Sequence, residues 1–290
     1  MSQEQNGGGP SFSFEVFPPN TQTGTEKIFD TLNQLQDLAP DFISVTCSNN
    51  QKNIETTTLK LAGYITNQLD IPTIAHLPAA YLSKEQVDVI LEKLQLLGVR
   101  RLLALRGDIF PDMPPKTDFH FASDLIAYIK KQAPQFEISG ACYPEIHPDS
   151  ASRVADVKNL KKKTDAGCNQ LITQLFFDNE LFYRFQEHCD LADIDVPILA
   201  GVMPIINRNQ ALRLIKTSEA KLPRKFLAIL EKYEHNPLAL RDAGIAYAID
   251  QIIDLVTQNA AGIHLYTMNN ADTARSIYQA TRSLFQGVGV

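Results

Sequence analysis

The sequence predicts a single (β/α)8 TIM barrel with parallel strands, and three observations support this fold class. Short apolar or β-branched segments alternate strictly with longer amphipathic segments, which is typical of a parallel sheet whose strands are joined by helices. Eight such repeats occur, the number at which a parallel sheet closes into a barrel. No G-x-G-x-x-G sequence follows the first strand, which argues against an open dinucleotide-binding sheet.

The strands are expected where short runs of β-branched, aromatic or aliphatic residues occur between polar or turn-forming residues. In chain order these runs are Ser11–Phe17, Asp41–Thr46, Pro72–His76, Arg100–Leu105, Glu137–Tyr143, Asn169–Gln174, Pro197–Gly201 and Gly262–Tyr266.

The helices are expected where apolar residues recur with the helical period, as Ile28, Leu32 and Leu35 do in the first helix. Ser83 and Gln86 form the signature of a capping box before the third helix. Three helical stretches fall between the last two strands, so we expect an extra helix in that connection. The expected helices are Thr25–Leu38, Ile54–Leu69, Val87–Leu97, Ala122–Lys131, Ala151–Ala166, Asn179–Cys189, Asn209–Thr217, Phe226–Tyr233, Leu238–Asn259 and Ala271–Phe285.

Composition limits the classes of protein and of partner. The chain has 290 residues, of which 44% are hydrophobic, and a net charge of −6, which gives no reason to expect nucleic acid or an anionic membrane as a partner. No apolar run approaches the ~20 residues of a membrane span. The four cysteines are scattered without metal-binding spacing, which is typical of a reduced cytoplasmic protein, and no metal is expected. We expect residues 1–10 to be a disordered tail, residues 11–290 to form one domain, and the chain to be a homo-oligomer.

Polar residues occur at the end of nearly every predicted strand. In a barrel these positions converge on one mouth, where functional side chains lie. Each residue also has an ordinary structural explanation, such as an ion pair for Glu15 or a core position for His76, but stability alone predicts no bias towards one end of the strands. The polar strand ends are Glu15, Thr46, His76, Arg106-Gly107-Asp108, Tyr143 with His147, Gln174 and Tyr266.

Two of these features indicate chemistry. Glu15 is an isolated carboxyl group among apolar neighbours, which suits general-acid catalysis. In the helix after the fifth strand, Asp156, Asn159 and Lys163 fall on one face, and a lysine there can hold a phosphate group. Glu15 has no second unpaired carboxylate nearby, so the pair of acids that a glycosidase needs is not indicated. No nucleophile–histidine arrangement is evident either.

Read together, the strand ends resemble the methylenetetrahydrofolate reductase family of the bacterial type, catalytic domain only. The resemblance runs in order along the whole chain, and its motifs are specific in combination. The matching pieces are FEVFPP (14–19), ISVT (43–46), AHL (75–77), LRGD (105–108), ASDL (122–125), YPEIHP (143–148), LKKKTDAGCN (160–169), ITQLFFD (172–178), GVMPI (201–205) and LYTMNN (265–270).

The resemblance implies an FAD-carrying barrel that reduces 5,10-methylenetetrahydrofolate to 5-methyltetrahydrofolate with NADH or NADPH, NADH being the commoner bacterial donor. The two substrates would use one site in turn. The resemblance assigns the role of general acid to Glu15 and an electrostatic role beside the flavin to Asp108. It assigns flavin contacts to Thr46, Cys47, Asn49, His76, Arg106, Gly107, Asp108, Phe121, Ala122, Tyr143, His147, Ser150, Asp156, Asn159, Lys162 and Lys163. It assigns substrate contacts to Glu15, Thr46, Gln174, Gln210 and Asn270.

The chain departs from a well-known branch of the family at three places. Cys47-Ser48-Asn49 replaces Tyr-Gly-Ala, Leu214 replaces an aromatic residue that stacks on the nicotinamide substrate, and Asn270 replaces a substrate-binding arginine. The alternatives are another flavin-dependent barrel, similar to proline dehydrogenase, and a non-catalytic barrel subunit. A non-catalytic subunit has no need of a general acid, so the presence of Glu15 argues against that alternative.

Overall fold

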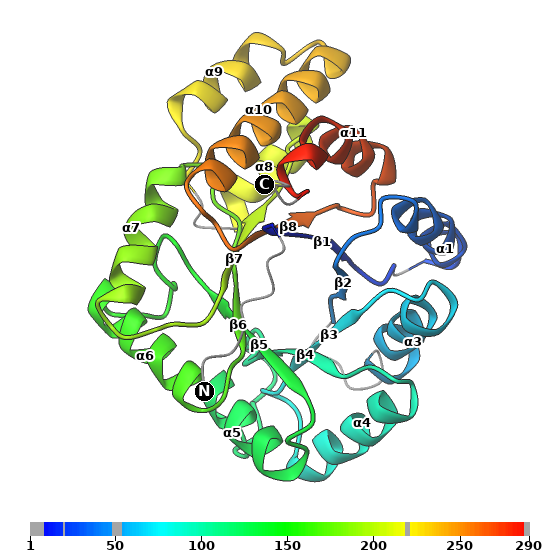
Figure 1. The fold of residues 1–290 in the computed structure, drawn as a ribbon, viewed down its shortest axis with the longest axis vertical. Coiled ribbons are helices and arrows are strands. Elements are labelled where there is room, and N and C mark those ends of the chain that lie inside the picture. Colours follow the sequence, from blue (N-terminus) through cyan, green and yellow to red (C-terminus); the bar gives the residue numbers. More distant parts are fainter. Residues whose placement is uncertain (1–8, 20, 48–53, 218–220, 287–290) are drawn as a thin grey trace.

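The computed structural model describes residues 9–19, 21–47, 54–217 and 221–286. Within them, eight strands form a closed barrel whose order follows the chain, and every neighbouring pair is parallel (Figure 1). The predicted fold class is therefore confirmed. The strands are β1 (Ser11–Val16), β2 (Phe42–Val45), β3 (Thr73–Pro78), β4 (Arg101–Leu105), β5 (Glu137–Cys142), β6 (Gln170–Thr173), β7 (Ile198–Val202) and β8 (Gly262–Tyr266).

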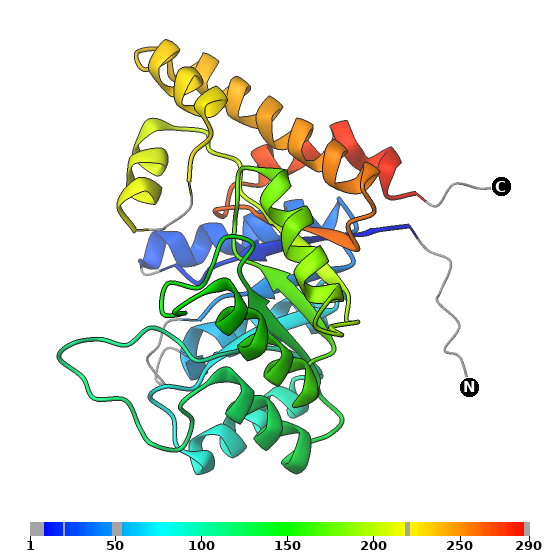
Figure 2. The same ribbon diagram turned by 90° about the vertical axis from the view of Figure 1, so that its left-hand side faces the viewer.

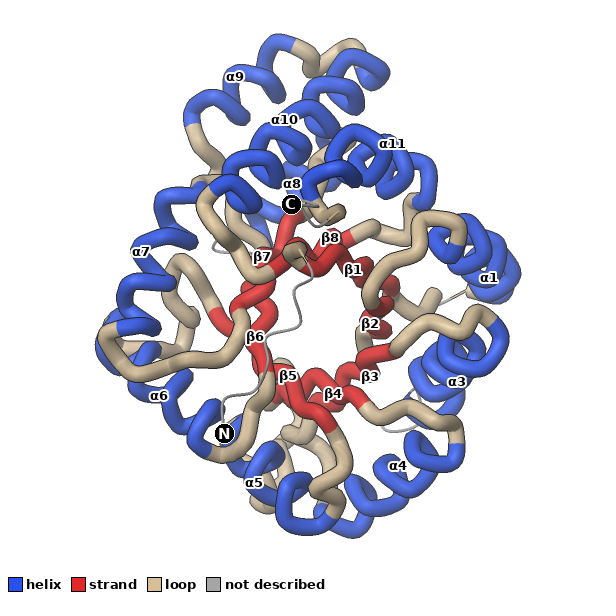
Figure 3. Tube along the Cα trace, in the orientation of Figure 1, coloured by secondary structure: helices blue, strands red, loops and turns tan. Residues whose placement is uncertain are grey.

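The helices surround this barrel as an outer ring (Figure 3). The three helical stretches predicted between the last two strands are all present as α8, α9 and α10. The helices are α1 (Gln22–Gln36), α3 (Leu59–Gln68), α4 (Lys84–Leu96), α5 (Ala122–Gln132), α6 (Arg153–Asp165), α7 (Asn179–Asp190), α8 (Arg208–Thr217), α9 (Arg224–Lys232), α10 (Pro237–Thr257) and α11 (Ala271–Thr281), with a π-helical turn at Ile54–Thr58 and a 3-10 turn at Arg282–Leu284.

Local signals set where several helices begin. The predicted capping box of α4 is formed: Ser83 Oγ accepts from the Gln86 N–H, and Gln86 Oε1 accepts from the Ser83 N–H. Pro237 opens α10 directly after Asn236, whose side chain accepts from the Ala239 N–H. These contacts satisfy N–H groups that the first helical turn leaves without partners.

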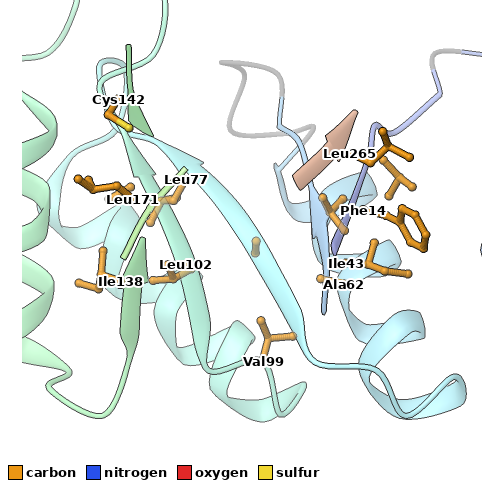
Figure 4. Close-up of a cluster of buried hydrophobic side chains, with 14 of the residues drawn as sticks. Phe14, Ile43, Ala62, Leu77, Val99, Leu102, Ile138, Cys142, Leu171 and Leu265 are labelled. Carbon is orange, nitrogen blue, oxygen red and sulfur yellow. The ribbon is translucent and has the colours of Figure 1, made fainter. Parts of the chain in front are cut away.

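The strands contribute to two parts of the hydrophobic core, because successive side chains of a strand point to opposite faces. The larger part lies between the outer face of the barrel and the helices, and includes Phe14, Leu102 and Leu171 (Figure 4). A smaller cluster fills the barrel interior with Phe42, Ile74, Leu103, Ile172 and Leu199. A third buried cluster, formed by Phe177, Ile205, Ala211 and Phe226, comes from the segments that follow β6 and β7. Each fully buried aliphatic or aromatic side chain contributes about 1.5–3 kcal/mol of stabilisation.

The connections that follow the strands gather at one mouth of the barrel. Figure 2 shows on its left side the long loop between β4 and α5 together with α8. The predicted tail at residues 1–10 lies almost entirely outside the described residues. Among the described residues, no helix combines the length and apolar character needed to cross a bilayer.

Candidate functional site

Glu15 lies inside the barrel at this mouth, between two histidines. Its Oε2 atom is 3.5 Å from Nε2 of His76 and 3.7 Å from Nε2 of His264, and its side chain is 19% exposed. Phe14 and Val16, its neighbours in β1, belong to the outer core instead. The carboxyl group therefore has polar neighbours within the barrel, rather than the apolar neighbours that the sequence around it suggests.

His76 presents a buried nitrogen to this carboxyl group. Its Nε2 has no hydrogen-bond partner within the described part of the chain. Burial lowers the pKa of His76 to about 4, so the imidazole is neutral at neutral pH. A neutral imidazole nitrogen accepts a hydrogen bond from a protonated carboxyl group and, in its other tautomer, donates one to a carboxylate. Its position therefore suits both protonation states of Glu15.

His264 is completely buried beneath Glu15 and is fixed by two serines. Its Nδ1 is 2.8 Å from Ser13 Oγ, and its Nε2 is 3.1 Å from Ser44 Oγ. Ser13 Oγ also donates to the Ile263 carbonyl oxygen at 3.1 Å, so it accepts from Nδ1–H of His264, and Nε2 accepts from the Ser44 hydroxyl. Ser13, Ser44 and His264 were not expected from the sequence as site residues. The two-residue period of β1 and β8 nevertheless places Ser13 on the same face as Glu15, and His264 on the same face as Tyr266.

Tyr266 forms the side of the mouth next to Glu15. Its hydroxyl donates to the Thr173 carbonyl oxygen at 2.6 Å. Burial and then the charge of Glu15 raise the pKa of Tyr266, so the phenol stays protonated. Gly201 makes room for the ring, because a Cβ atom there would lie 2.7 Å from Tyr266 Cε2. The Thr267 hydroxyl and N–H both donate to the Glu15 carbonyl oxygen, at 2.6 and 3.3 Å, which holds the backbone of the acid.

A cavity of about 290 Å³ lies between β4, β5, α5 and α6. Twelve of the residues expected to contact the flavin line it: Arg106, Gly107, Asp108, Phe121, Ala122, Tyr143, His147, Ser150, Asp156, Asn159, Lys162 and Lys163. Other lining residues were not expected from the sequence, among them Ser123, Cys142, Asp149 and Phe185. The barrel thus brings residues as far apart in the chain as Arg106 and Lys163 to one cavity.

The loop after β4 gives one wall of the cavity. Arg106 Nη2 donates to Asp149 Oδ2 at 2.7 Å, and this bond lowers the pKa of Asp149. Gly107 has a φ of +88°, a conformation that favours glycine. Asp108 follows as an exposed side chain at the edge of the cavity.

The start of α6 and the loop before it give the opposite wall. Asp156 accepts from the Ser150 hydroxyl at 3.0 Å and from the His147 N–H at 3.3 Å, and the His147 ring packs edge-on against Tyr143 with 4.6 Å between centroids. Burial lowers the pKa of His147 and raises that of Tyr143. The loop is therefore held by a carboxylate of the helix rather than by regular backbone pairing.

Two lysines of α6 bring positive charge to the cavity. Lys163 Nζ donates to the Ala141 carbonyl oxygen at 2.7 Å, and Lys162 Nζ donates to Asn159 Oδ1 at 3.1 Å. Burial lowers the pKa of Lys163. With Arg106, they supply the donors that phosphate oxygens require, and the 61% exposed ring of Phe121 offers an aromatic surface. The lining therefore fits a ligand with phosphates and aromatic rings.

Other predicted site residues lie outside this cavity lining. Thr46 and Cys47 follow β2, and burial raises the pKa of the Cys47 thiol to about 11. Asn49 lies outside the described residues. Gln174 is exposed after β6, with its Oε1 accepting from the Leu175 N–H at 2.9 Å.

The side chains of Gln210 and Asn270 make local backbone contacts. Gln210 accepts from the Ile206 N–H at 3.1 Å and donates to the Pro204 carbonyl oxygen at 3.0 Å, which braces the loop after β7. Asn270 caps α11 by accepting from the Thr273 N–H at 2.9 Å. Both side-chain amides therefore stabilise local backbone structure.

The fold and the site define a class of protein: a parallel (β/α)8 barrel with an internal carboxyl group and, at the C-terminal ends of its strands, a cavity lined by basic and aromatic residues. The family is given by comparison with known proteins: the family model described as methylenetetrahydrofolate reductase matches residues 1–282. The chain belongs to the methylenetetrahydrofolate reductase family.

Relatives match most of this chain. A 5,10-methylenetetrahydrofolate reductase of Buchnera aphidicola is 34% identical, with 92% of this chain and 90% of that protein covered. The protein of the same name from Escherichia coli is 33% identical, with 91% and 88% covered. Methylenetetrahydrofolate reductase (NADH) 1 of Arabidopsis thaliana is 33% identical over 90% of this chain and 46% of its own length.

A solved structure agrees on the fold. A protein from Clostridium thermocellum, described as binding two copies of 5-methyl-5,6,7,8-tetrahydrofolic acid, superposes with a TM-score of 0.64. It is 14% identical and 97% of each chain is covered, so the likeness is one of fold.

Proposed function

We propose that this protein reduces 5,10-methylenetetrahydrofolate to 5-methyltetrahydrofolate by a ping-pong reaction, with NADH or NADPH as donor and FAD as bound cofactor. The observation that supports this most directly is the presence of both an internal carboxyl group at Glu15 and a basic cavity at the ends of β4 and β5, in a chain of this family. Such a reaction belongs to one-carbon metabolism and methionine biosynthesis. The buried thiols of Cys142, Cys168 and Cys189, none in a disulfide, support a cytoplasmic location.

The cavity lining supports FAD as the group it binds. Lys162, Lys163 and Arg106 would hold the diphosphate, and Phe121 and Tyr143 would contact ring systems. When bound, the flavin supplies the capacity to accept hydride from one substrate and to pass it to the next. The twelve lining residues that match expected flavin contacts support this location.

Glu15 would supply a proton to N10 of the folate. The bond between N10 and the bridging methylene carbon then breaks, and its electron pair stays on N10. The resulting iminium cation at N5 accepts hydride at the methylene carbon, which becomes the methyl group. His264, fixed by Ser13 and Ser44, and His76 would hold the carboxyl group in place for this transfer.

Asp108 and Gln174 complete the proposed assignments. A carboxylate at Asp108 would stabilise the cationic folate through charge. Gln174, exposed at the end of β6, would bind both substrates through its amide. NADH is the preferred choice of donor, since the names of plant relatives specify it.

An absorption spectrum of the purified protein tests the proposal first. We expect a yellow protein whose flavin absorption is bleached anaerobically by NADH and restored by methylenetetrahydrofolate. Proline in place of the nicotinamide is the control, because bleaching by proline would indicate the alternative barrel oxidase. A colourless protein that does not bind added FAD would refute the proposed function.

A further inference from the structure

The segment after β6 is held by side chains of a helix distant in sequence. The last backbone bond to a neighbouring strand is donated by the Gln174 N–H to the Cys142 carbonyl oxygen, at 2.7 Å. The carbonyl groups of Phe176 and Phe177 bond to α10 instead. Gln251 Nε2 donates to the first at 2.9 Å, and the Tyr247 hydroxyl donates to the second at 2.8 Å.

These two bonds lie in a packed environment. Gln251 is 5% exposed, and Phe176 and Phe177 are both buried. The Phe177 ring stacks on Phe226 of α9 with 5.8 Å between centroids, and the Tyr247 ring meets Phe226 edge-on at 5.1 Å. A buried carbonyl group that loses its partner costs about 1–3 kcal/mol, so the segment has one strongly preferred position.

The far end of the segment is attached to the same helix. Asn179 Nδ2 donates to the Gln251 carbonyl oxygen at 3.1 Å and to Asp254 Oδ2 at 2.7 Å. From Phe176 to Asn179 the chain is therefore bonded to α10 at three successive points. Gln174 itself makes the last strand bond, two residues before the first of these attachments.

We propose that Tyr247 and Gln251 are positioning residues for Gln174, so that α10 sets where the substrate-binding amide lies. The inference rests on the proposed function, because it gives Gln174 a substrate to bind. The strand bond at its own N–H and the α10 bonds that begin two residues later reduce the range of positions that the exposed Gln174 amide occupies. A displacement of about 1 Å from the reactive geometry lowers rates by about a hundredfold in unfavourable cases.

The test uses substitutions that remove each hydrogen bond and keep the size of the side chain. Gln251→Met and Tyr247→Phe each delete one donor to the segment. Thr257→Val is the matched control, because its hydroxyl donates to the Ile253 carbonyl oxygen within the same helix at 2.7 Å and not to the segment. We expect roughly tenfold lower kcat/KM for methylenetetrahydrofolate in the first two variants, mainly through KM, with FAD content unchanged, and no change in the control.

A double-mutant cycle with Gln174→Ala separates positioning from general destabilisation. If Gln251 acts through Gln174, Gln251→Met has no further effect on kcat/KM once Gln174 is absent. Additive losses, or α10 variants that behave like Thr257→Val, overturn the inference. If Gln174→Ala alone changes nothing, Gln174 binds no substrate and the inference falls with that assignment.

Amide hydrogen exchange gives a reading that needs no activity. The N–H groups of residues 175–179 should exchange faster in Gln251→Met and Tyr247→Phe than in Thr257→Val. Unchanged exchange overturns the positioning even in an active enzyme. Faster exchange in a protein that lacks folate reductase activity supports the attachment by α10 and refutes the proposed function alone.

Discussion

The Nε2 atom of His264 lies 3.7 Å from Oε2 of Glu15, and His264 is completely buried while Glu15 is not. A substrate at the barrel mouth therefore reaches the carboxyl group but not the imidazole. Ser13 and Ser44 form hydrogen bonds to the two nitrogens of the His264 ring, so the orientation of the ring beneath Glu15 is fixed. In the proposed reaction, His264 would therefore act through the position of Glu15.

Glu15→Gln should separate the two halves of the proposed reaction. The amide keeps the size and polarity of the side chain but has no acidic proton for N10, so flavin reduction by NADH should continue while folate reduction falls by about 10²–10⁴-fold. Stopped-flow absorbance measures the two steps separately. Glu26→Gln, on the exposed side of α1, is the control. Equal losses in both steps would remove Glu15 from the role of general acid.

His76 should make the protein less stable in mild acid. Its pKa is lowered from 6.5 to about 4 by burial, so the unfolded chain binds a proton that the folded protein does not bind between these values. Stability therefore falls as the pH drops from 6.5 towards 4, by about 3 kcal/mol for this group.

Urea denaturation across this pH range tests the contribution of His76. The pH dependence of the free energy of unfolding should be flatter by about that amount in His76→Gln. His188→Gln, an exposed change on α7, should keep the wild-type slope. An unchanged slope in His76→Gln would show that this imidazole is not held neutral.

The eight strands could be predicted from local patterns of apolar and polar residues, whereas twelve of the residues that line the cavity were named through the family resemblance. Strand ends converge in any parallel barrel, so motifs such as LRGD and YPEIHP met where the fold requires. The hydrogen-bond partners of these residues were harder to predict from the sequence. Nothing local to Arg106 indicates that Asp149 is its acceptor, since only the closed barrel brings the two loops together.

The buried group beneath Glu15, formed by His264, Ser13 and Ser44, could have been predicted only in part from the sequence. His264 lies two residues before Tyr266, and the period of a strand places both on one face, but a histidine in an apolar run more often belongs to the core. The register that puts Ser13 opposite His264 depends on how the barrel closes. Similarly, the sequence Asn270-x-x-Thr273 before a helix was a readable signal for an N-cap.

Lys163→Met should weaken FAD binding. The substitution removes a charged donor from the cavity wall, and a hydrogen bond to a charged group contributes about 1.5–3 kcal/mol, so the Kd should rise by about tenfold or more. Lys161→Met is the control, because Lys161 pairs with Asp165 at 2.7 Å and does not line the cavity. Fluorescence titration of the apoprotein measures both affinities. Equal Kd values for the two variants would mean that the phosphates do not contact Lys163.

The last prediction concerns the loop that carries Asp108. Both of its ends bond to Ala80, through Arg106 O at 2.8 Å and Lys116 N at 2.8 Å. The Tyr81 hydroxyl holds the tip, accepting from the Phe110 N–H at 2.7 Å and donating to the Met113 carbonyl oxygen at 3.2 Å.

Tyr81→Phe deletes both bonds of the tip but keeps the stacking of the ring on Phe110, so the loop should open more often while the barrel stays intact. A loss of about 1 kcal/mol corresponds to roughly fivefold faster amide exchange between residues 107 and 115, with an unchanged melting temperature. Tyr128→Phe, which loses a bond to Asp88 on the outer helices, should leave this exchange as it is. Equally fast exchange of the loop in both variants would show that the Tyr81 hydroxyl does not stabilise the loop that carries Asp108.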